Sequence, residues 1–244
     1  MANQIYIQYQ MVNYIDIYLD RDEFADRLGG SIPKGSIFII EGEDGAGKSI
    51  ISQRLSYGSL LNKNKVTYIS SELSVVDFVK QMDSLGYDIK DYLLSQDLLF
   101  ISTLYMFGKI KEKENLIFEL TKEKSRKIFD SDLIILDSLS YPLINGLDKM
   151  GSVRLLEFLN KVKNMEKTII ITYSPNDINE FFVKNIRRIA DIYFDLKFSS
   201  IDEGSGLKMV NIRRFRYARG VYNNVIPFRV EPNIGLIVEI SSYV

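Results

Sequence analysis

The sequence contains no cysteine and no histidine. Without cysteine it can form no disulfide, and it offers neither a thiolate nucleophile nor a cysteine metal site. Without histidine it lacks the commonest general base and the commonest ligand of transition metals. Any chemistry must therefore use carboxylates, lysine, arginine and hydroxyl groups, together with a hard cation such as Mg²⁺.

Long hydrophobic runs are also missing. The longest apolar runs lie near Ile37–Ile40 and Leu133–Leu136, whereas a membrane span needs about 20 apolar residues. The first residues, Met1–Tyr18, alternate polar and apolar side chains and lack the basic start and apolar run of a targeting segment. We therefore expect a soluble, cytoplasmic protein with no direct insertion into a membrane.

No charge of one sign dominates the chain. Its 31 lysines and arginines and 32 acidic residues give a net charge of −1. Because a dedicated nucleic-acid binder usually carries a basic domain, we expect no nucleic-acid partner, although this balance leaves room for a local basic patch. The 244 residues are 46% hydrophobic, which suffices for a sizeable core. No repeat or linker is visible, so we expect a single domain over residues 1–244.

Apolar strands and amphipathic helices alternate along most of the chain. Expected strands lie at Ser36–Glu41, Val66–Ser70, Leu98–Ser102, Leu133–Asp137 and Thr168–Tyr173. Expected helices lie at Lys48–Leu61, Ser74–Leu85, Lys109–Phe129, Ser152–Met165 and Ile178–Ala190. Four further strands, joined by short polar turns, are expected at Ile192–Phe198, Leu207–Arg216, Ile226–Val230 and Leu236–Ile240. Since short turns favour hairpins, we expect an α/β fold: a largely parallel central sheet flanked by helices, with an antiparallel C-terminal extension.

The segment Gly42–Ser49 matches the phosphate-loop (P-loop) pattern G-x-x-x-x-G-K-[ST] in full. Glycines let backbone N–H groups turn inward around phosphate oxygens. Lys48 would place a positive charge at the β- and γ-phosphates, and Ser49 would supply a hydroxyl ligand to Mg²⁺. The helix that begins here adds its positive N-terminal end. We therefore expect ATP and Mg²⁺ as cofactors. The residues expected to hold the nucleotide are Gly42, Asp44, Gly45, Ala46, Gly47, Lys48, Ser49 and Ile50.

Three acidic side chains need a separate interpretation. Glu43 and Asp44 lie inside the loop, and side chains at such positions are expected to point to solvent. Asp137 follows four apolar residues, Leu133–Leu136, which places its carboxylate at the carboxyl end of a buried strand. Ligands of open α/β sheets gather at that edge. Together with Ser49, Asp137 is therefore expected to hold the metal, in its case through water.

Four segments resemble the motifs of one family. They are Leu28–Ser36 (LGGSIPKGS), Ser71-Glu72-Leu73, Asp137-Ser138 and Tyr217-Ala218-Arg219-Gly220. Their order resembles that of RecA-type ATPases, most closely the KaiC-like branch, and the resemblance covers about Ile15 to Glu239. Within this branch the chain looks like the FlaH (ArlH) family, the ATP-binding subunits of the archaeal flagellum (archaellum) motor. The resemblance implies a RecA-like P-loop core.

The same resemblance implies two catalytic residues. Glu72 matches the carboxylate that activates the attacking water, although Leu73 stands where the family has a second glutamate; alternatively, Glu72 merely precedes the helix cap Ser74. Arg219 matches an arginine that reaches a neighbouring subunit's nucleotide, although Tyr217 stands where the family has a lysine.

Two further features each have two possible interpretations. On one continuous strand Arg213 and Arg219 would share a face, with Arg214 and Arg216 on the other; a charged edge strand is the alternative reading. Thr172-Tyr173 suits either a γ-phosphate sensor or a plain strand end.

Two functions are compatible with these features. The resemblance implies an ATP-binding regulatory or scaffold subunit of the archaellum motor, with slow or no hydrolysis. It also implies a homo-oligomeric ring, a hexamer, that lies peripherally at the membrane-bound motor. The implied partners are a motor ATPase, a membrane platform protein and a ring scaffold protein. The alternative is a recombination or DNA-dependent ATPase of the RecA class, for which the Arg213–Arg219 segment with its aromatic residues would have to bind single strands. A small-molecule kinase fits less well, because no arginine-rich lid segment is visible.

Overall fold

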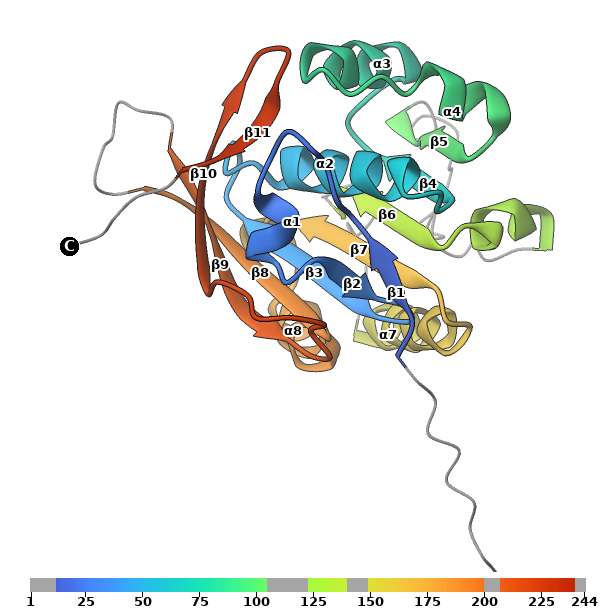
Figure 1. Ribbon diagram of the computed structural model, residues 1–244. Coiled ribbons are helices and arrows are strands. Elements are labelled where there is room, and N and C mark those ends of the chain that lie inside the picture. Colours follow the sequence, from blue (N-terminus) through green and yellow to red (C-terminus); the bar gives the residue numbers. More distant parts are fainter. Residues whose placement is uncertain (1–11, 105–122, 140–148, 200–206, 240–244) are drawn as a thin grey trace, which may run out of the picture.

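The computed structural model describes residues 12–104, 123–139, 149–199 and 207–239. Its main feature is a nine-stranded sheet in the order β11-β10-β9-β8-β3-β7-β6-β4-β5 (Figure 1). The parallel strands are β3 (Ile37–Gly42), β4 (Val66–Ser70), β5 (Leu98–Ser102), β6 (Leu133–Asp137), β7 (Thr168–Tyr173) and β8 (Ile192–Phe198). The antiparallel strands are β9 (Lys208–Phe215), β10 (Val225–Glu231) and β11 (Gly235–Val238). The expected α/β fold with an antiparallel C-terminal extension is confirmed.

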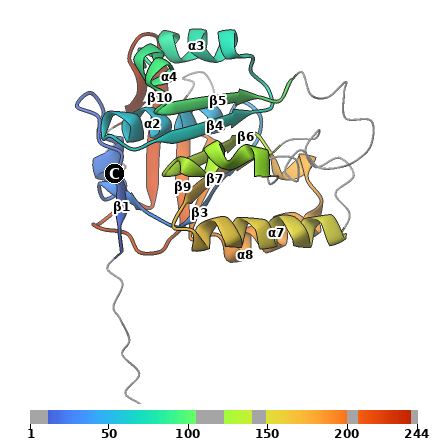
Figure 2. The ribbon, with the colours of Figure 1, turned by 90° about the vertical axis from the view of Figure 1, so that its right-hand side faces the viewer.

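Helices cover both faces of the parallel sheet. On one face lie α2 (Lys48–Leu61), α3 (Val75–Ser84) and α4 (Lys90–Ser95), together with α1 (Phe24–Arg27). On the other face α7 (Lys149–Asn164) and α8 (Glu180–Ile189) lie side by side (Figure 2). A small sheet of β1 (Tyr14–Asp16) and β2 (Ser31–Pro33) precedes β3. Among the described helices, none combines the length and the apolar character needed to cross a bilayer.

The central strand β3 shows why both faces need helices. Phe38 and Ile40 pack in the core beneath α2, whereas Ile37 and Ile39 pack in the core beneath α7 and α8. Successive side chains of a strand point to opposite faces, so a continuous apolar run produces a strand that is buried on both sides. This burial holds β3 firmly below the loop that follows Gly42.

The expected helix cap Ser74 is formed, and one expected helix differs in type where it can be compared. The side chain of Ser74 accepts a hydrogen bond from the Asp77 N–H at the start of α3. The expected helix at Lys109–Phe129 lies mostly outside the described residues, and its last part belongs to a 3₁₀ helix, Glu123–Asp130. There the Thr67 hydroxyl donates to the Ile128 carbonyl over 3.2 Å. Tertiary contact with β4 thus overrides the helical charge pattern.

The chain after β9 also differs from the expectation. β9 ends at Phe215, and Tyr217 has a φ of 59°. A left-handed residue turns the chain out of the extended conformation. Arg219 is therefore not on the strand, and the expected shared face of Arg213 and Arg219 is wrong.

The C-terminal hairpin of β10 and β11 reaches α3 (Figure 1). The Asn233 N–H donates to the Ser84 carbonyl over 2.8 Å, and the Leu236 N–H donates to the Tyr87 hydroxyl over 3.2 Å. Gly86 has a φ of 69°, and a Cβ at this position would lie 2.3 Å from the Asn233 carbonyl oxygen. The antiparallel extension therefore folds back over the α2 face and does not continue as a flat sheet.

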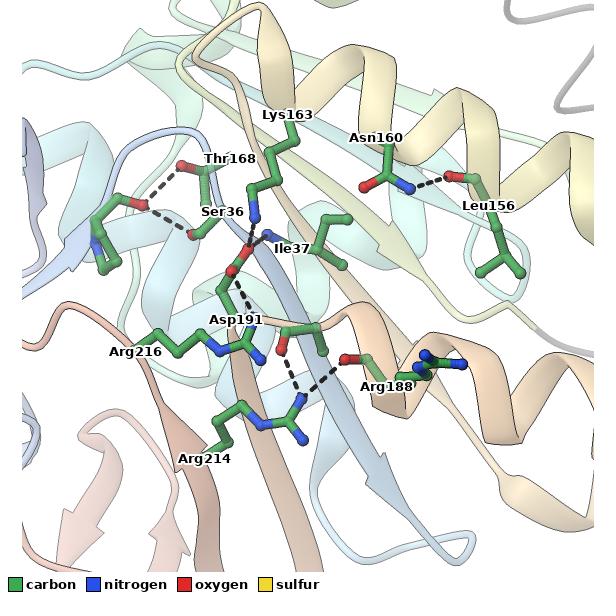
Figure 3. A network of polar contacts seen from close by, with 12 residues as sticks. Ser36, Ile37, Leu156, Asn160, Lys163, Thr168, Arg188, Asp191, Arg214 and Arg216 are labelled. Atoms are coloured by element: carbon green, nitrogen blue, oxygen red, sulfur yellow. Dashed lines mark hydrogen bonds and ion pairs between the residues drawn. The ribbon is translucent and has the colours of Figure 1, made fainter. Parts of the chain in front are cut away.

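The amino edge of the sheet is closed by a charged network around Asp191 (Figure 3). The Ile37 N–H donates to Asp191 Oδ2 over 3.1 Å, and Lys163 Nζ of α7 donates to the same oxygen over 2.6 Å. Arg216 forms a longer ion pair of 3.6 Å with Oδ1. Arg214 donates to the carbonyls of Arg187 and Ala190 at the end of α8, each over 2.8 Å. The network anchors the first residue of β3, whose other end carries the P-loop.

Candidate functional site

The P-loop joins the end of β3 directly to the start of α2. Gly45 and Gly47 have φ values of 77° and 98°, a region that glycine enters without steric cost. A Cβ at Gly47 would lie 2.9 Å from the ring of Phe228, so the position also lacks space for a side chain. Positive φ values at glycines are the backbone feature on which a phosphate cradle depends, and within the loop the Ala46 N–H donates to the Glu43 carbonyl over 3.2 Å.

Lys48 lies folded against the loop that it follows. Its Nζ donates to the carbonyls of Gly42 and Glu43 over 2.8 and 2.9 Å. It also forms a loose ion pair of 3.5 Å with Asp44, whose side chain is exposed. The ammonium group is thus buried at the mouth of the loop, while the side chain of Asp44 points to solvent as expected. Ala46 is buried, the loop residues Asp44, Gly45, Gly47, Lys48 and Ser49 line one cavity, and Gly42 and Glu43 line a different one.

Asp137 lies at the end of β6, and β7 separates it from the P-loop strand. Ser49 and Thr172 donate to Asp137 Oδ1 over 3.1 and 2.7 Å, and Tyr68 donates to Oδ2 over 2.5 Å. Burial raises the pKa of Asp137, and these three hydroxyl donors partly oppose that rise. The structure therefore brings the two expected metal residues, Ser49 and Asp137, into direct contact.

The donor set fits Mg²⁺ better than a metal that needs a full protein cage. Among the described residues, no group of three or more histidine, aspartate or glutamate side chains could hold a metal ion. Mg²⁺ usually takes only one or two protein oxygens and completes its shell with phosphates and water. One hydroxyl and one carboxylate beside a phosphate cradle meet that requirement.

Glu72 follows β4, the strand next to β6. The hydroxyl of Ser70 accepts hydrogen bonds from the N–H groups of Glu72 and Leu73 over 3.2 and 3.0 Å, which forms a tight turn. Glu72 is exposed, yet partial desolvation raises its pKa, and the charge of Asp137 raises it further. This is the electrostatic setting expected of a carboxylate that accepts a proton.

One cavity of about 420 Å³ collects Lys48, Ser49 and Glu72, whereas Asp137 contacts Ser49 but does not line the cavity. Its walls are Asp44, Gly45, Gly47, Lys48, Ser49, Ile50, Glu72, Ser138 and Lys208. Lys208 comes from β9, far along the chain, and the sequence contains no local signal for it. Tyr68 was also missed, because a tyrosine inside an apolar strand looks like an ordinary core residue.

Arg219 lies away from this cavity. It forms an ion pair of 3.2 Å with Asp16 and lies over the Tyr14 ring at 5.7 Å. β9 runs antiparallel to β8, and its last residue pairs with the first of β8, so Arg219 follows at the amino edge of the sheet. The P-loop lies at the carboxyl edge. Within one chain, therefore, Arg219 does not reach the expected nucleotide.

The pair Thr172-Tyr173 divides between the two faces of the sheet. Thr172 bonds Asp137 in the P-loop site, whereas the Tyr173 hydroxyl donates to Glu41 on the α8 face over 2.8 Å. Only Thr172 is placed where a γ-phosphate sensor would act.

Known proteins match the chain along nearly its whole length. A family model described as "ATPase: KaiC" matches residues 11–242. The chain is 37% identical to the archaeal flagellar ATP-binding protein FlaH of Methanocaldococcus jannaschii over 227 residues, 93% of this chain and 96% of the relative. It is 36% identical to FlaH of Methanococcus voltae over 232 residues, 95% and 99% of the two chains. The crystal structure of the flagellar accessory protein FlaH from M. jannaschii superposes with a TM-score of 0.84 at 35% identity, covering 94% of this chain and 100% of that one.

Proposed function

Because this chain belongs to the KaiC family of RecA-type ATPases and is similar to FlaH, we propose that it is an ATP-binding regulatory or scaffold subunit of the archaellum motor. In this proposal Mg-ATP occupies the P-loop cavity and controls assembly or motor activity. Residues 1–244 act as a single ATP-binding domain. The names of the FlaH relatives support the association with the archaeal flagellum.

The observation that carries the nucleotide part is the meeting of Lys48, Ser49 and Asp137 at one edge of the sheet. They supply a cation for the phosphates, a hydroxyl for Mg²⁺ and a carboxylate for its water shell. Glu72, in the same cavity, is the residue that would position or activate water. When bound, Mg²⁺ would supply charge neutralisation for the β- and γ-phosphates.

Slow or absent hydrolysis is proposed from what the site lacks within one chain. Leu73 replaces a second carboxylate, and Arg219 lies at the opposite edge of the sheet. A hexameric ring could bring Arg219 to a neighbour's nucleotide and so make hydrolysis depend on assembly. The proposed partners remain the motor ATPase, the membrane platform protein and the ring scaffold protein, with the chain peripheral at the motor.

The test compares binding with turnover. Lys48→Ala is expected to abolish binding of a fluorescent ATP analogue, whereas Glu72→Gln is expected to preserve binding and remove residual phosphate release. The exposed Lys80→Ala serves as a control. Unchanged affinity in Lys48→Ala would sink the assignment of the cavity, and brisk hydrolysis by the isolated wild type would contradict a regulatory role.

The recombination alternative loses its main support. Arg213 pairs with Asp195, Arg214 bonds the carbonyls at the end of α8, and Arg216 pairs with Asp191. These arginines thus contact three different partners, and only Arg213 lines the cavity beside the P-loop, so within the described residues they are not gathered along one surface of the kind that single strands occupy. A titration with single-stranded DNA at about 150 mM salt is expected to show no binding; tight binding with a steep salt dependence would favour the alternative.

A further inference from the structure

A second cavity, of about 700 Å³, lies on the α8 face of the sheet next to the P-loop. Its walls come from the carboxyl ends of β3 and β8, from α8 and from β9. It shares no lining residue with the P-loop cavity. Its volume is within the range of small-molecule sites, about 300–1,000 Å³, and it occupies the sheet edge where ligands of α/β proteins gather.

Two carboxylates at the floor of this cavity are already paired within the chain. Glu41 accepts from Nε of Arg187 over 2.7 Å and also from its Nη2, so the pair is bidentate. The hydroxyls of Tyr173 and Tyr193 donate to Glu41 over 2.8 and 3.2 Å. Burial and the charge of Glu41 raise the pKa of Tyr193 to about 12, so this hydroxyl stays a donor. The carboxylate of Glu41 is therefore bonded to groups of the protein itself.

The second carboxylate, Asp195, is held in the same way. Arg213 donates to Asp195 Oδ2 over 2.7 and 3.1 Å, and Lys197 lies 3.6 Å from the same oxygen. Because both cations share one oxygen, they lie close together over the cavity. Arg187 forms the neighbouring wall.

Exposure separates the two signs of charge. The side chains of Arg187, Arg213 and Lys197 are 39%, 51% and 57% exposed, against 7% for Glu41 and 15% for Asp195. A ligand that enters the cavity thus meets these three cations before their two carboxylate partners, and it also meets the exposed Glu43. Phe198, also exposed, adds an apolar wall.

We propose that this cavity binds a small phosphate-bearing ligand at a site separate from the P-loop cavity, although Gly42 and Glu43 of the loop line it. The phosphate contacts Arg187, Arg213 and Lys197, whose guanidinium and ammonium groups suit phosphate oxygens. A flat organic group, where the ligand has one, packs on Phe198. Glu43 lies on the P-loop side of the cavity, so its charge limits how much negative charge the ligand carries.

The experiment uses the full chain with Lys48→Ala, which removes the phosphate-binding lysine of the P-loop. Pyrophosphate is titrated without Mg²⁺ by calorimetry, at about 50 mM salt to limit screening. We expect binding to persist in this background. Adding Lys197→Ala and Arg213→Ala should weaken it at least about tenfold, since two of three charge-assisted contacts are lost.

The control adds Lys80→Ala and Arg154→Ala, which remove the same two charges from exposed sites outside the cavity. It is expected to change the affinity by less than about twofold. Circular dichroism and thermal melting check that both variants fold, and Lys197→Arg with Arg213→Lys should restore binding. No pyrophosphate binding in the Lys48→Ala chain, or an equal loss in the control, overturns the proposal. These readouts do not depend on whether the P-loop holds ATP.

Two further measurements sharpen the assignment. Glu43→Gln should strengthen pyrophosphate binding, because a nearby like charge is removed; weaker binding would place the anion elsewhere. Titrations with AMP and with inorganic phosphate distinguish a phosphate ester from free phosphate as the natural ligand. An ester is indicated when AMP binds more tightly than inorganic phosphate and Phe198→Ala removes that difference, and free phosphate is indicated when the two bind alike.

Discussion

Asp137 and Asp191 are both buried carboxylates, 4% and 1% exposed, at opposite edges of the same sheet. Asp191 accepts a backbone N–H and is paired with Lys163 and Arg216 (Figure 3). Asp137 accepts three hydroxyl groups, and no ion pair is formed by it within the described residues. Asp191 is thus neutralised by the protein's own cations, whereas Asp137 forms hydrogen bonds to hydroxyl groups instead.

The other two buried carboxylates of the described residues are, like Asp191, paired with cations. Asp22 is paired with Arg54 and Glu41 with Arg187. An unpaired charge away from water is costly, so a buried carboxylate with only hydroxyl partners is suited to lie beside a bound cation. In this protein that carboxylate adjoins the P-loop, which is where Mg²⁺ would accompany ATP.

The substitution with the largest expected effect tests whether the ion pairs of Asp191 stabilise the fold. Asp191→Ala removes the common partner of Lys163, Arg216 and the Ile37 N–H. We expect the free energy of unfolding to fall by about 3 kcal/mol, measured by urea denaturation. The exposed Asp91→Ala should stay within about 0.5 kcal/mol of wild type. An equally small change in Asp191→Ala would show that the network is not structural.

Asp137→Asn tests the functional side and should act in the opposite direction. Without nucleotide it should leave the free energy of unfolding unchanged or raise it by about 1 kcal/mol, because an unneutralised buried charge is removed. In the wild type, removing Mg²⁺ with a chelator should weaken ATP binding at least about tenfold. In Asp137→Asn that dependence should largely disappear. A loss of stability as large as that of Asp191→Ala would break the contrast.

Glu41→Gln probes a carboxylate of the paired class that lies directly before the P-loop. Its neutral side chain cannot pair with Arg187, so we expect a loss of about 1–2 kcal/mol in the free energy of unfolding. A double-mutant cycle with Arg187→Gln should give a coupling energy of about 1–3 kcal/mol. Since Glu41 precedes Gly42, a few-fold weaker affinity for ATP should accompany the change. Additive effects of the two variants would contradict the pair.

The smallest effect concerns Tyr193, whose pKa is raised to about 12 by burial and by the charge of Glu41. The unfolded chain releases this proton near a pH of about 10. The contribution of Tyr193 to the free energy of unfolding is therefore fully present below that pH, and it is lost as the pH rises from about 10 to about 12. Tyr193→Phe should flatten the fall, and tyrosinate absorbance should follow the titration. An unchanged profile in the variant would assign the fall to other groups.

The P-loop site could be predicted from the sequence because its parts are local or end a strand. Gly45, Gly47 and Lys48 act through one turn and one helix start, and Asp137 closes an apolar run that can only be a buried strand. Glu72 was identified through the family motif, and the structure places it in the cavity that Gly45, Gly47 and Lys48 also line. These predictions required no knowledge of which strands are neighbours.

Other residues depend on pairings between distant segments. Lys208 enters the P-loop cavity only because β9 follows β8 in the sheet. Glu41 gains Arg187 and two tyrosines from three elements that lie at least 132 positions away. The error over Arg219 has a local cause, since the positive φ of Tyr217 ends the extended conformation where the residue pattern alone continues it.

By itself, then, the sequence determined the α/β class, the nucleotide loop and the carboxylate that follows β6, because these follow from periodicity and backbone chemistry. Only the tertiary structure decided which buried charges are neutralised. Asp191 and Asp137 both lie beside an apolar strand in the sequence, and the arginines just before Asp191, Arg187 and Arg188, are not the cations that pair with it. The difference arises because α7 and the residue after β9 bring Lys163 and Arg216 to Asp191, whereas Asp137 receives three hydroxyl groups.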